Sequence, residues 1–525
     1  MCGIIGIIGT DEAAKEAYLG LCVLQHRGQD GAGIVTFDSQ REIPFQMVKG
    51  LGLVEKAIPK DALKRLTGSI AVGHTRYSTV GSSSDERNLQ PMLLNFPLPM
   101  SFCHNGNVIN YFSLKDELRR KTGWAPLSNN DLEIIMQIFV QNLLGKNMGV
   151  GDGGCQEEDE KPHQLQVVKE NGVGVLLEEG LEDDLILAVR RAVKAVLQQA
   201  IGGYAVVTSI LDRYLIGYCD VNGIRPLVVG KKLLPSGKTA YALASETNAL
   251  HFLGYDVLDF VKGGELLIID GYQAKLHRIL LPKQEREFGD KKAAACMFEW
   301  VYFSAAESSL QGLHVYQARL RLGELLALEA QKYFEVHGVY PDLVSPIPET
   351  SRSAALSVAE KLNLPYRECL VKNRYVQRSF IMGETSDRKR VVDLKLSPIR
   401  SEIEGKSILL VDDSIVRGTT LKRIVEIVRN SGAKKIFVAS TCPPIKYGCY
   451  YGIDFPDPKQ LLANQVSWEK IAEYLDVDGV IYLSLQGLKQ ALKGESMCMA
   501  CLTGEYPAGE QFIDEFQKRR ELSRG

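Results

Sequence analysis

The sequence has no long hydrophobic run and no excess of charge of one sign. Scattered charged residues interrupt every apolar stretch before it reaches the roughly 18 residues that a membrane-spanning helix needs. Lysine and arginine total 62, aspartate and glutamate total 64, and the formal net charge is therefore −2. Because this balance gives no general attraction to nucleic acid or to an anionic membrane, we expect neither as a partner.

The first ten residues also lack the positive charge of a secretory signal or an Arg-rich transit peptide, and they lead directly into Asp11 and Glu12. We therefore expect a cytoplasmic protein. Eleven cysteines is an odd number in a chain of 525 residues without an export signal, so disulfides are disfavoured. Metal binding and nucleophilic catalysis become the more informative roles for these thiols.

The overall composition is typical of globular domains, and the length of 525 residues predicts two to four of them. In the first half, short apolar segments predict a mixed α/β domain with strands at 3–8, 33–37, 70–74, 204–209, 214–219 and 266–269. Beyond about residue 282, apolar runs alternate with amphipathic helices, a pattern typical of a parallel sheet. The strands predicted for this sheet are 343–347, 407–411, 435–440 and 480–485.

A polar link near residues 275–290 separates the two patterns, so we place one domain at 2–280 and a second at 281–525. In the second, a helix beginning near Thr420 is predicted to turn one apolar stripe toward the sheet. Glycine and acidic residues are concentrated between about 145 and 180, which indicates an exposed insertion in the first domain.

Cys2 follows the initiator methionine directly. A small second residue usually permits removal of that methionine, which would leave the α-amine on Cys2 itself. An α-amine has a reference pKa of about 7.7–8.0 and can act as the general base for its own thiol. On position alone, the alternative that Cys2 is simply a small buried residue at the start of a strand is equally favoured.

Three further segments bear on this choice. Together with Cys2, and in the same order, the segments 25–33, 73–79 and 104–107 resemble the class II glutamine amidotransferase domain. The resemblance implies a four-layer αββα N-terminal-nucleophile fold, in which Cys2 attacks the amide of glutamine. A departure is Gly31, where that family often has serine.

The same resemblance assigns the other residues of a glutamine site. It implies that the Asn105 side chain and the Gly106 backbone N–H form the oxyanion hole. It also implies that Arg76 and Asp131 bind the α-carboxylate and α-amine of glutamine. Taken singly, Asn105-Gly106 is a common turn dipeptide, and the two charged residues could be surface charges.

In the second domain, an apolar strand ends in Asp412 and Asp413 and is followed by a small polar loop that leads into a helix. Hydroxyls and backbone N–H groups of residues 414–420 could cradle a phosphate at the helix N-terminus, while the two carboxylates suit sugar hydroxyls or Mg²⁺. Two adjacent acids at a strand end are also common in solvated turns.

The segment 408–420 resembles the phosphoribosyl diphosphate (PRPP) signature of type I phosphoribosyltransferases. The resemblance implies that Asp412 and Asp413 bind the ribose hydroxyls, directly or through Mg²⁺. The residues that it assigns to the PRPP phosphate are Ser414, Arg417, Gly418, Thr419 and Thr420.

Two other segments would complete this site. Residues 346–351 look like the pyrophosphate loop of that family, with Thr350 at a position associated with Mg²⁺. Lys372 and Arg374, in the tetrapeptide 372–375, supply cations for a diphosphate leaving group. Taken alone, a basic tetrapeptide of this kind is more often an exposed turn. The polar, basic stretch 377–400 resembles the flexible loop that closes over PRPP.

Cys498 and Cys501 form a C-x-x-C pair, which can clasp one metal ion or cluster. With Cys296 and Cys449, they stand in contexts that resemble amidophosphoribosyltransferases carrying a structural 4Fe-4S cluster. A tetrahedral zinc site is the chemical alternative, and four buried reduced thiols are a third possibility. Departures from the family occur at Gly448, where proline is usual, and at 305–306, where Arg-Pro is usual.

Both halves together resemble the amidophosphoribosyltransferase family. The resemblance implies transfer of ammonia from glutamine to PRPP, giving 5-phosphoribosylamine, glutamate and pyrophosphate in the first step of de novo purine synthesis. It further implies a homo-oligomer, a dimer or tetramer, that is inhibited by purine nucleotides such as AMP and GMP. Other glutaminase families lack the acid pair at 412–413, and a noncatalytic PRPP or nucleotide sensor would need no glutaminase residues.

Overall fold

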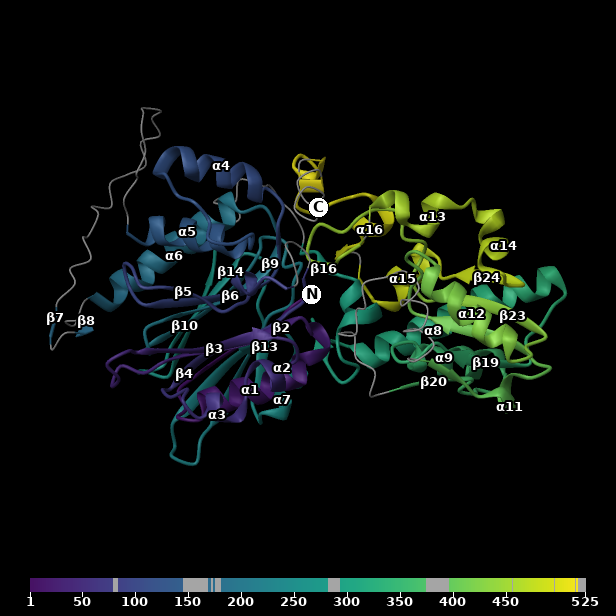
Figure 1. The fold of residues 1–525 in the computed structure, drawn as a ribbon, viewed down its shortest axis with the longest axis horizontal. Helices are drawn as coiled ribbons and strands as arrows, with labels where there is room; N and C mark the ends of the chain where they lie inside the picture. The colour runs from purple at the N-terminus through teal and green to yellow at the C-terminus, as the bar shows by residue number, and fades with distance from the viewer. Residues whose placement is uncertain are drawn as a thin grey trace. The chain divides into compact units, whose positions relative to one another are not determined.

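The computed structural model divides into two compact units (Figure 1). The residues described are 1–78, 84–144, 169–170, 173–174, 181–281, 293–373, 396–455, 457–494, 496–514 and 516–517. The first unit comprises Met1–Ala295, Tyr450–Ile453 and Pro507–Gly525, and the second comprises Cys296–Cys449 and Asp454–Tyr506.

The domain limits inferred from the sequence stay predictions, and most of the insertion at 145–180 lies outside the described residues. Two short strands, β7 (Lys169–Glu170) and β8 (Val173–Gly174), pair with each other inside that stretch. In the described part of the chain, no helix combines the length and apolar character needed to cross a membrane.

The first unit is built on two antiparallel sheets. The seven-stranded sheet has the order β13-β11-β12-β1-β4-β2-β3. Its strands are β1 (Gly3–Ile8), β2 (Gly31–Phe37), β3 (Phe45–Leu51), β4 (Ile70–Arg76), β11 (Val228–Leu233), β12 (Thr239–Ala244) and β13 (Asp256–Phe260). The six-stranded sheet has the order β15-β14-β10-β9-β6-β5. Its strands are β5 (Met92–Leu94), β6 (Met100–Val108), β9 (Gly202–Ile210), β10 (Tyr214–Cys219), β14 (Glu265–Asp270) and β15 (Lys275–Leu280).

Alternation along β1 shows how these sheets form layers. Ile4 and Ile8 belong to the core between the two sheets, which also contains Val207 of β9. Ile5 and Ile7 instead belong to the core beneath the helices on the other face. The helices on this side are α1 (Ala13–Val23), α2 (Val54–Ala57), α3 (Lys60–Leu63) and α7 (Thr247–Phe252), and those on the six-stranded sheet are α4 (Tyr111–Thr122), α5 (Leu132–Leu143) and α6 (Leu181–Gln199) (Figure 1). The expected αββα order is confirmed.

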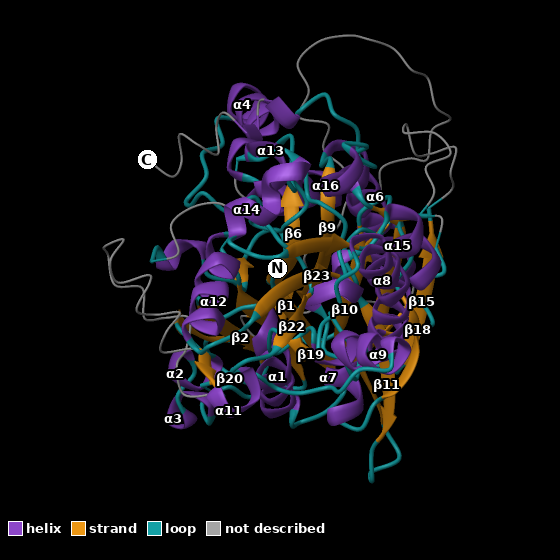
Figure 2. Ribbon diagram, turned by 90° about the vertical axis from the view of Figure 1, so that its right-hand side faces the viewer, coloured by secondary structure: helices purple, strands orange, loops and turns teal. Residues whose placement is uncertain are grey.

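The second unit has the predicted parallel sheet, in the order β19-β22-β23-β24. Its strands are β19 (Leu343–Pro346), β22 (Ser407–Asp412), β23 (Lys435–Ser440) and β24 (Gly479–Tyr482). The predicted stripe on α12 (Thr419–Asn430) is buried, and α8 (Val315–His337) covers the other face, where the rings of Phe334 and Phe437 lie 5.3 Å apart. Figure 2 shows α12 and α8 on opposite sides of β22 and β23.

The parallel register brings two loops of this unit together. Pro346 pairs with Val411, and Ile347 N donates to Val411 O at 2.8 Å, so the loops after β19 and β22 leave the same edge of the sheet. The first loop leads to α9 (Arg352–Leu362), and the second leads to α12. Other elements of the second unit are β17 (Ser309–Leu310), β18 (Leu313–His314), β20 (Leu370–Lys372), β21 (Leu396–Pro398), α11 (Arg400–Ile403), α13 (Leu462–Gln465), α14 (Ile471–Leu475), α15 (Leu485–Ala491), β25 (Met497–Cys498) and α16 (Ala500–Thr503).

Candidate active site

Cys2 lies at the start of β1, where its backbone meets a strand of the other sheet. Cys2 N donates to Asn105 Oδ1 at 3.0 Å, and the Cys2 sulfur accepts from Tyr77 N at 3.4 Å. Burial raises the pKa of the Cys2 thiol, while the positive chain terminus and Arg76 oppose that rise. The thiol is therefore held mainly in its protonated form, and a base would have to remove its proton for it to act as a nucleophile.

Asn105 and Gly106 lie within β6 and not in a turn. Asn105 is fully buried, and its Nδ2 has no hydrogen-bond partner among the described residues, so a donor is available beside Cys2. Gly106 has a φ of 136°, and a Cβ there would lie 2.0 Å from Gly203 O of β9. This position therefore requires glycine.

The two residues predicted to hold the ends of glutamine are both buried, which disfavours the surface-charge alternative. Arg76 ends β4, and burial lowers the pKa of its guanidinium, while the nearby Cys2 opposes that shift. Asp131 immediately precedes α5, where it accepts from Val108 N at 2.7 Å and lies 3.0 Å from His104 Nε2. The structure thus brings Arg76 close to Cys2, whereas the contacts found for Asp131 in the described chain are to Val108 and His104.

A buried ion pair next to Cys2 was not foreseen from the sequence. Arg27 Nη1 contacts Glu246 Oε1, and Arg27 Nε donates to Cys2 O at 3.1 Å. His26 Nε2 lies 2.8 Å from the same Glu246 oxygen. Residues 26 and 27 belong to the glutaminase-like segment 25–33, whereas Glu246 stands in a polar stretch, 245–248, that gave no signal of this pairing.

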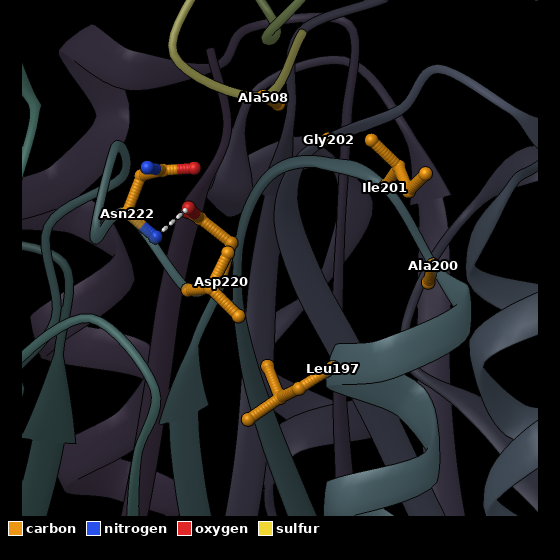
Figure 3. Close-up of a pocket in the computed structure, with 8 residues that line it drawn as sticks. Leu197, Ala200, Ile201, Gly202, Asp220, Asn222 and Ala508 are labelled. Carbon is orange, nitrogen blue, oxygen red and sulfur yellow. Dashed lines mark hydrogen bonds between the residues drawn. The ribbon is translucent and has the colours of Figure 1, made fainter. Parts of the chain in front are cut away.

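A small pocket of the first unit is lined by other residues (Figure 3). Its empty volume, which includes space open to solvent, is about 280 Å³. The pocket is lined by Leu197, Ala200, Ile201, Gly202, Asp220, Val221, Asn222 and Ala508. Burial raises the pKa of Asp220 to about 6 even though its carboxylate accepts from Asn222 N at 2.8 Å. None of the lining residues was predicted to bind substrate.

In the second unit, Asp412 ends β22 and Asp413 begins the loop that follows. Asp413 N donates to Asp412 Oδ1 at 3.0 Å, and Ser414 Oγ donates to Asp413 Oδ1 at 2.9 Å. Burial, reinforced by the Asp413 charge, raises the pKa of Asp412 well above its ordinary value. Burial also raises the pKa of Asp413 to about 6. Both carboxylates are partly buried, unlike the acids of a fully solvated turn.

The residues around this acid pair are arranged as a loop followed by a helix. Gly418 has a φ of 74° and caps α12, whose first two residues are Thr419 and Thr420. Because the loops after β19 and β22 leave one edge of the sheet, the Thr350 loop neighbours the acid pair. Lys372 ends β20 and is exposed, and Arg374 lies outside the described residues.

The four cysteines predicted to bind metal gather in one buried region of the second unit. Burial raises the pKa of the Cys501 thiol well above its ordinary value, and nearby thiols add to the rise. Those thiols belong to Cys442, Cys449, Cys296 and Cys498. In the described ranges, no group of three or more His, Cys, Asp or Glu side chains is arranged to hold a metal ion. Cys442, to which the sequence assigned no role, is thus a fifth thiol in the same buried region.

Comparisons with known proteins cover the whole chain. The family model "Phosphoribosyl transferase domain" matches residues 315–472. An amidophosphoribosyltransferase of Pseudomonas aeruginosa is 35% identical over 528 residues, covering 99% of this chain and 96% of that protein. One from Saccharomyces cerevisiae is 35% identical over 529 residues, with the same coverage.

A solved structure agrees with these relatives. The glutamine PRPP amidotransferase of B. subtilis, complexed with ADP and GMP, superposes with a TM-score of 0.77 at 32% identity and covers 96% of this chain and 97% of its own. The chain therefore belongs to the amidophosphoribosyltransferase family, enzymes that use glutamine to aminate PRPP in the first committed step of purine biosynthesis.

Proposed function

We propose that the reaction is divided between two sites, with glutamine hydrolysed at Cys2 and the resulting ammonia displacing pyrophosphate from PRPP beside Asp412 and Asp413. The products are glutamate, pyrophosphate and 5-phosphoribosylamine. The observation that carries the first half is the unused amide donor of Asn105, which is buried and hydrogen-bonded through its other atom to Cys2.

At the glutamine site, removal of Met1 converts the Cys2 nitrogen from an amide into an α-amine. This amine takes the proton from the thiol, whose raised pKa otherwise keeps it protonated. The sulfur then attacks the side-chain carbonyl of glutamine, and Asn105 Nδ2 with the Gly106 N–H stabilises the oxyanion. The amine returns the proton to the departing ammonia, and water hydrolyses the thioester to release glutamate.

Arg76 and Asp131 hold the substrate for this attack in the proposal. A guanidinium suits the α-carboxylate of glutamine, and a carboxylate suits its α-ammonium. Both side chains are buried in the first unit, which supports roles inside a site over roles as surface charges. Asp131 would receive the α-ammonium in addition to its contact with His104.

At the second site, Asp412 and Asp413 bind the ribose hydroxyls of PRPP. The N-terminus of α12 and its preceding loop bind the 5-phosphate through Ser414, Arg417, Gly418, Thr419 and Thr420. Lys372 and Arg374 balance the charge of the departing pyrophosphate. Support comes from the loop-to-helix arrangement after β22 and from its closeness to the loop after β19.

Magnesium fits this donor set. Mg²⁺ prefers oxygen ligands and is commonly held by one or two carboxylates together with substrate phosphates. Thr350, Asp412 and Asp413 would supply the protein oxygens, and the two partly buried carboxylates have the right chemistry for a cation. When bound, the ion neutralises charge on the diphosphate.

The four thiols of Cys296, Cys449, Cys498 and Cys501 are proposed to hold a 4Fe-4S cluster. All four side chains are buried, and their sulfur atoms are the soft donors that such clusters take. The described side chains are not grouped as closely as a single metal ion requires, so the proposal rests on burial and donor chemistry. The cluster would act as a structural cross-link between distant parts of the second unit. Zinc remains the chemical alternative for the same thiols.

Purine nucleotides are proposed to regulate the enzyme. The B. subtilis enzyme is complexed with ADP and GMP, which supports inhibition of this chain by purine nucleotides. We place the protein in the cytoplasm as a homo-oligomer, a dimer or a tetramer.

Covalent labelling tests the glutamine site. A diazoketone analogue of glutamine should modify one residue per chain, identified as Cys2 by peptide mass spectrometry, and should abolish glutamine-dependent but not ammonia-dependent synthesis. Stoichiometric labelling at another cysteine would exclude Cys2 as the nucleophile.

A further inference from the structure

The main chain of Cys2 is held on both sides by buried side chains. Asn105 Oδ1 accepts from Cys2 N at 3.0 Å, and Arg27 Nε donates to Cys2 O at 3.1 Å. Removal of Met1 would leave no preceding peptide to restrain Cys2. The contact to its carbonyl oxygen would then fix the residue from the chain side.

Arg27 can hold that oxygen only while its own cation is stabilised. Its side chain is fully buried, and burying a cation without a counter-charge is costly. Glu246, also fully buried, contacts Arg27 Nη1 and supplies the opposite charge. His26 Nε2, at 2.8 Å from the same oxygen, is partly exposed and supports the carboxylate from the solvent side.

The backbone beside Glu246 is tied to the strand that carries Cys2. Ile4 N donates to Ser245 Oγ at 3.0 Å, and Ser245 N donates to Ile4 O at 3.0 Å. The Glu246 carboxylate therefore reaches Arg27 from a segment that is hydrogen-bonded to Ile4, two residues after Cys2. Glu246 is thus held near Cys2 in two ways: by the hydrogen bonds between Ser245 and Ile4, and by its own ion pair with Arg27.

We infer that Glu246 is a positioning residue for the Cys2 nucleophile, acting through Arg27 on the Cys2 carbonyl oxygen. This rests on the proposed role of Cys2. Glu246 is assigned no contact with glutamine, so its charge should affect how well the sulfur is aimed and not how tightly glutamine is held.

Glu246→Gln keeps the shape of the side chain and removes its charge. We expect kcat for glutamine hydrolysis, and the rate of diazoketone labelling at Cys2, to fall by about 10²-fold, the size of effect that a small misplacement of a reacting group produces. KM for glutamine should stay within about twofold, because uniform substrate binding is untouched. Ammonia-dependent synthesis should be unchanged.

A matched control separates positioning from general loss of stability. Arg213 and Asp270 form another buried ion pair of the same unit, with Arg213 Nη2 2.9 Å from Asp270 Oδ2. Asp270→Asn should lower the melting temperature as Glu246→Gln does, yet leave kcat per folded molecule at the parent value. Equal losses of kcat in the two variants would overturn the inference.

A second variant keeps the test decisive if Glu246→Gln folds poorly. In the double variant Arg27→Met/Glu246→Leu both charges are absent, and apolar replacement of a buried pair commonly preserves stability. We expect a near-parent melting temperature with kcat still about 10²-fold low. Parent kcat in the folded double variant would contradict the inference, and failure to label Cys2 in the parent protein would instead refute the proposed nucleophile.

Discussion

Cys2 and Asn105 belong to different sheets and meet through a single hydrogen bond, from Cys2 N to Asn105 Oδ1 at 3.0 Å. That bond occupies the oxygen of the Asn105 amide. The amide nitrogen is buried, has no partner in the described chain, and is therefore available as a donor. A leftover donor beside a thiol is costly in a folded core unless a substrate oxygen uses it.

Asn105→Ala removes this donor. We expect kcat for glutamine hydrolysis to fall by about 10²–10³-fold, the usual cost of losing one oxyanion-hole donor, with ammonia-dependent synthesis unchanged. Steady-state kinetics with both nitrogen sources would measure this. Asn110→Ala is the matched control. It deletes a buried amide whose side-chain hydrogen bonds, in the described part of the chain, are to Gln199 O and Ile201 N, so it should lower stability and not kcat.

Gly106→Ala should prevent the first unit from packing normally. A Cβ would lie 2.0 Å from Gly203 O, and a φ of 136° disfavours any L side chain, so we expect a loss of at least about 3 kcal/mol in unfolding free energy. Gly123→Ala offers the comparison, because a Cβ at Gly123 meets no atom within 4 Å, and its φ of 71° should cost only about 1–2 kcal/mol. Denaturant unfolding of both variants would measure the difference, and equal losses would contradict the steric argument.

Binding of Mg²⁺ with PRPP should depend on pH through Asp413. Because burial raises the pKa of Asp413 to about 6, its carboxyl is mostly neutral at pH 5 and cannot serve an ion or a sugar hydroxyl as a carboxylate. Affinity should therefore rise by about tenfold between pH 5 and pH 7. In the free protein the sign is opposite: the native state holds this proton more tightly than the unfolded chain, so this carboxyl lowers stability as pH rises from about 4 to 6.

Calorimetric titration of the parent and of Asp413→Asn would test this. The ionisation of PRPP itself is common to both proteins, so a smaller pH dependence in the variant isolates Asp413. An equal pH dependence of affinity in the parent and in Asp413→Asn would show that the Asp413 carboxyl does not take part in binding.

The buried thiol cluster should contain iron when the protein is purified without oxygen. We expect about four irons per chain and broad visible absorbance. Cys498→Ser should lose the metal and lower the melting temperature of the second unit, whereas Cys369→Ser, at a buried thiol outside the cluster, should keep it. Zinc without iron would favour the Cys₄ zinc site, and active protein without metal would leave these cysteines as buried thiols.

Local patterns predicted much of the fold. Short apolar runs located β1, β4, β9, β10 and all four strands of the parallel sheet, and the 3.6-residue periodicity located the buried face of α12. The motif containing Asn105 was recognised as a segment, but its dipeptide Asn-Gly reads locally as a turn. Pairing with β9 over the full length of β6 keeps it in a strand, and such long-range pairing is not visible in a local pattern.

The same limitation explains the missed site residues. Glu246 meets Arg27 from 219 positions away, and nothing near either residue in the chain shows that they form a pair. Cys442 stands alone in the sequence, and the loop that follows it contacts the C-x-x-C segment from far along the chain. Lys446 N and Tyr447 N both donate to Cys501 O at 3.0 Å.

The division into two sites is tested most directly by Cys2→Ala, assayed for 5-phosphoribosylamine formation with glutamine and, separately, with added ammonia. Only the nucleophile is lost, so glutamine-dependent synthesis should fall by about 10³-fold or more, while ammonia-dependent synthesis stays within about twofold of the parent. Equal loss with both nitrogen sources, or undiminished synthesis from glutamine, would contradict the account.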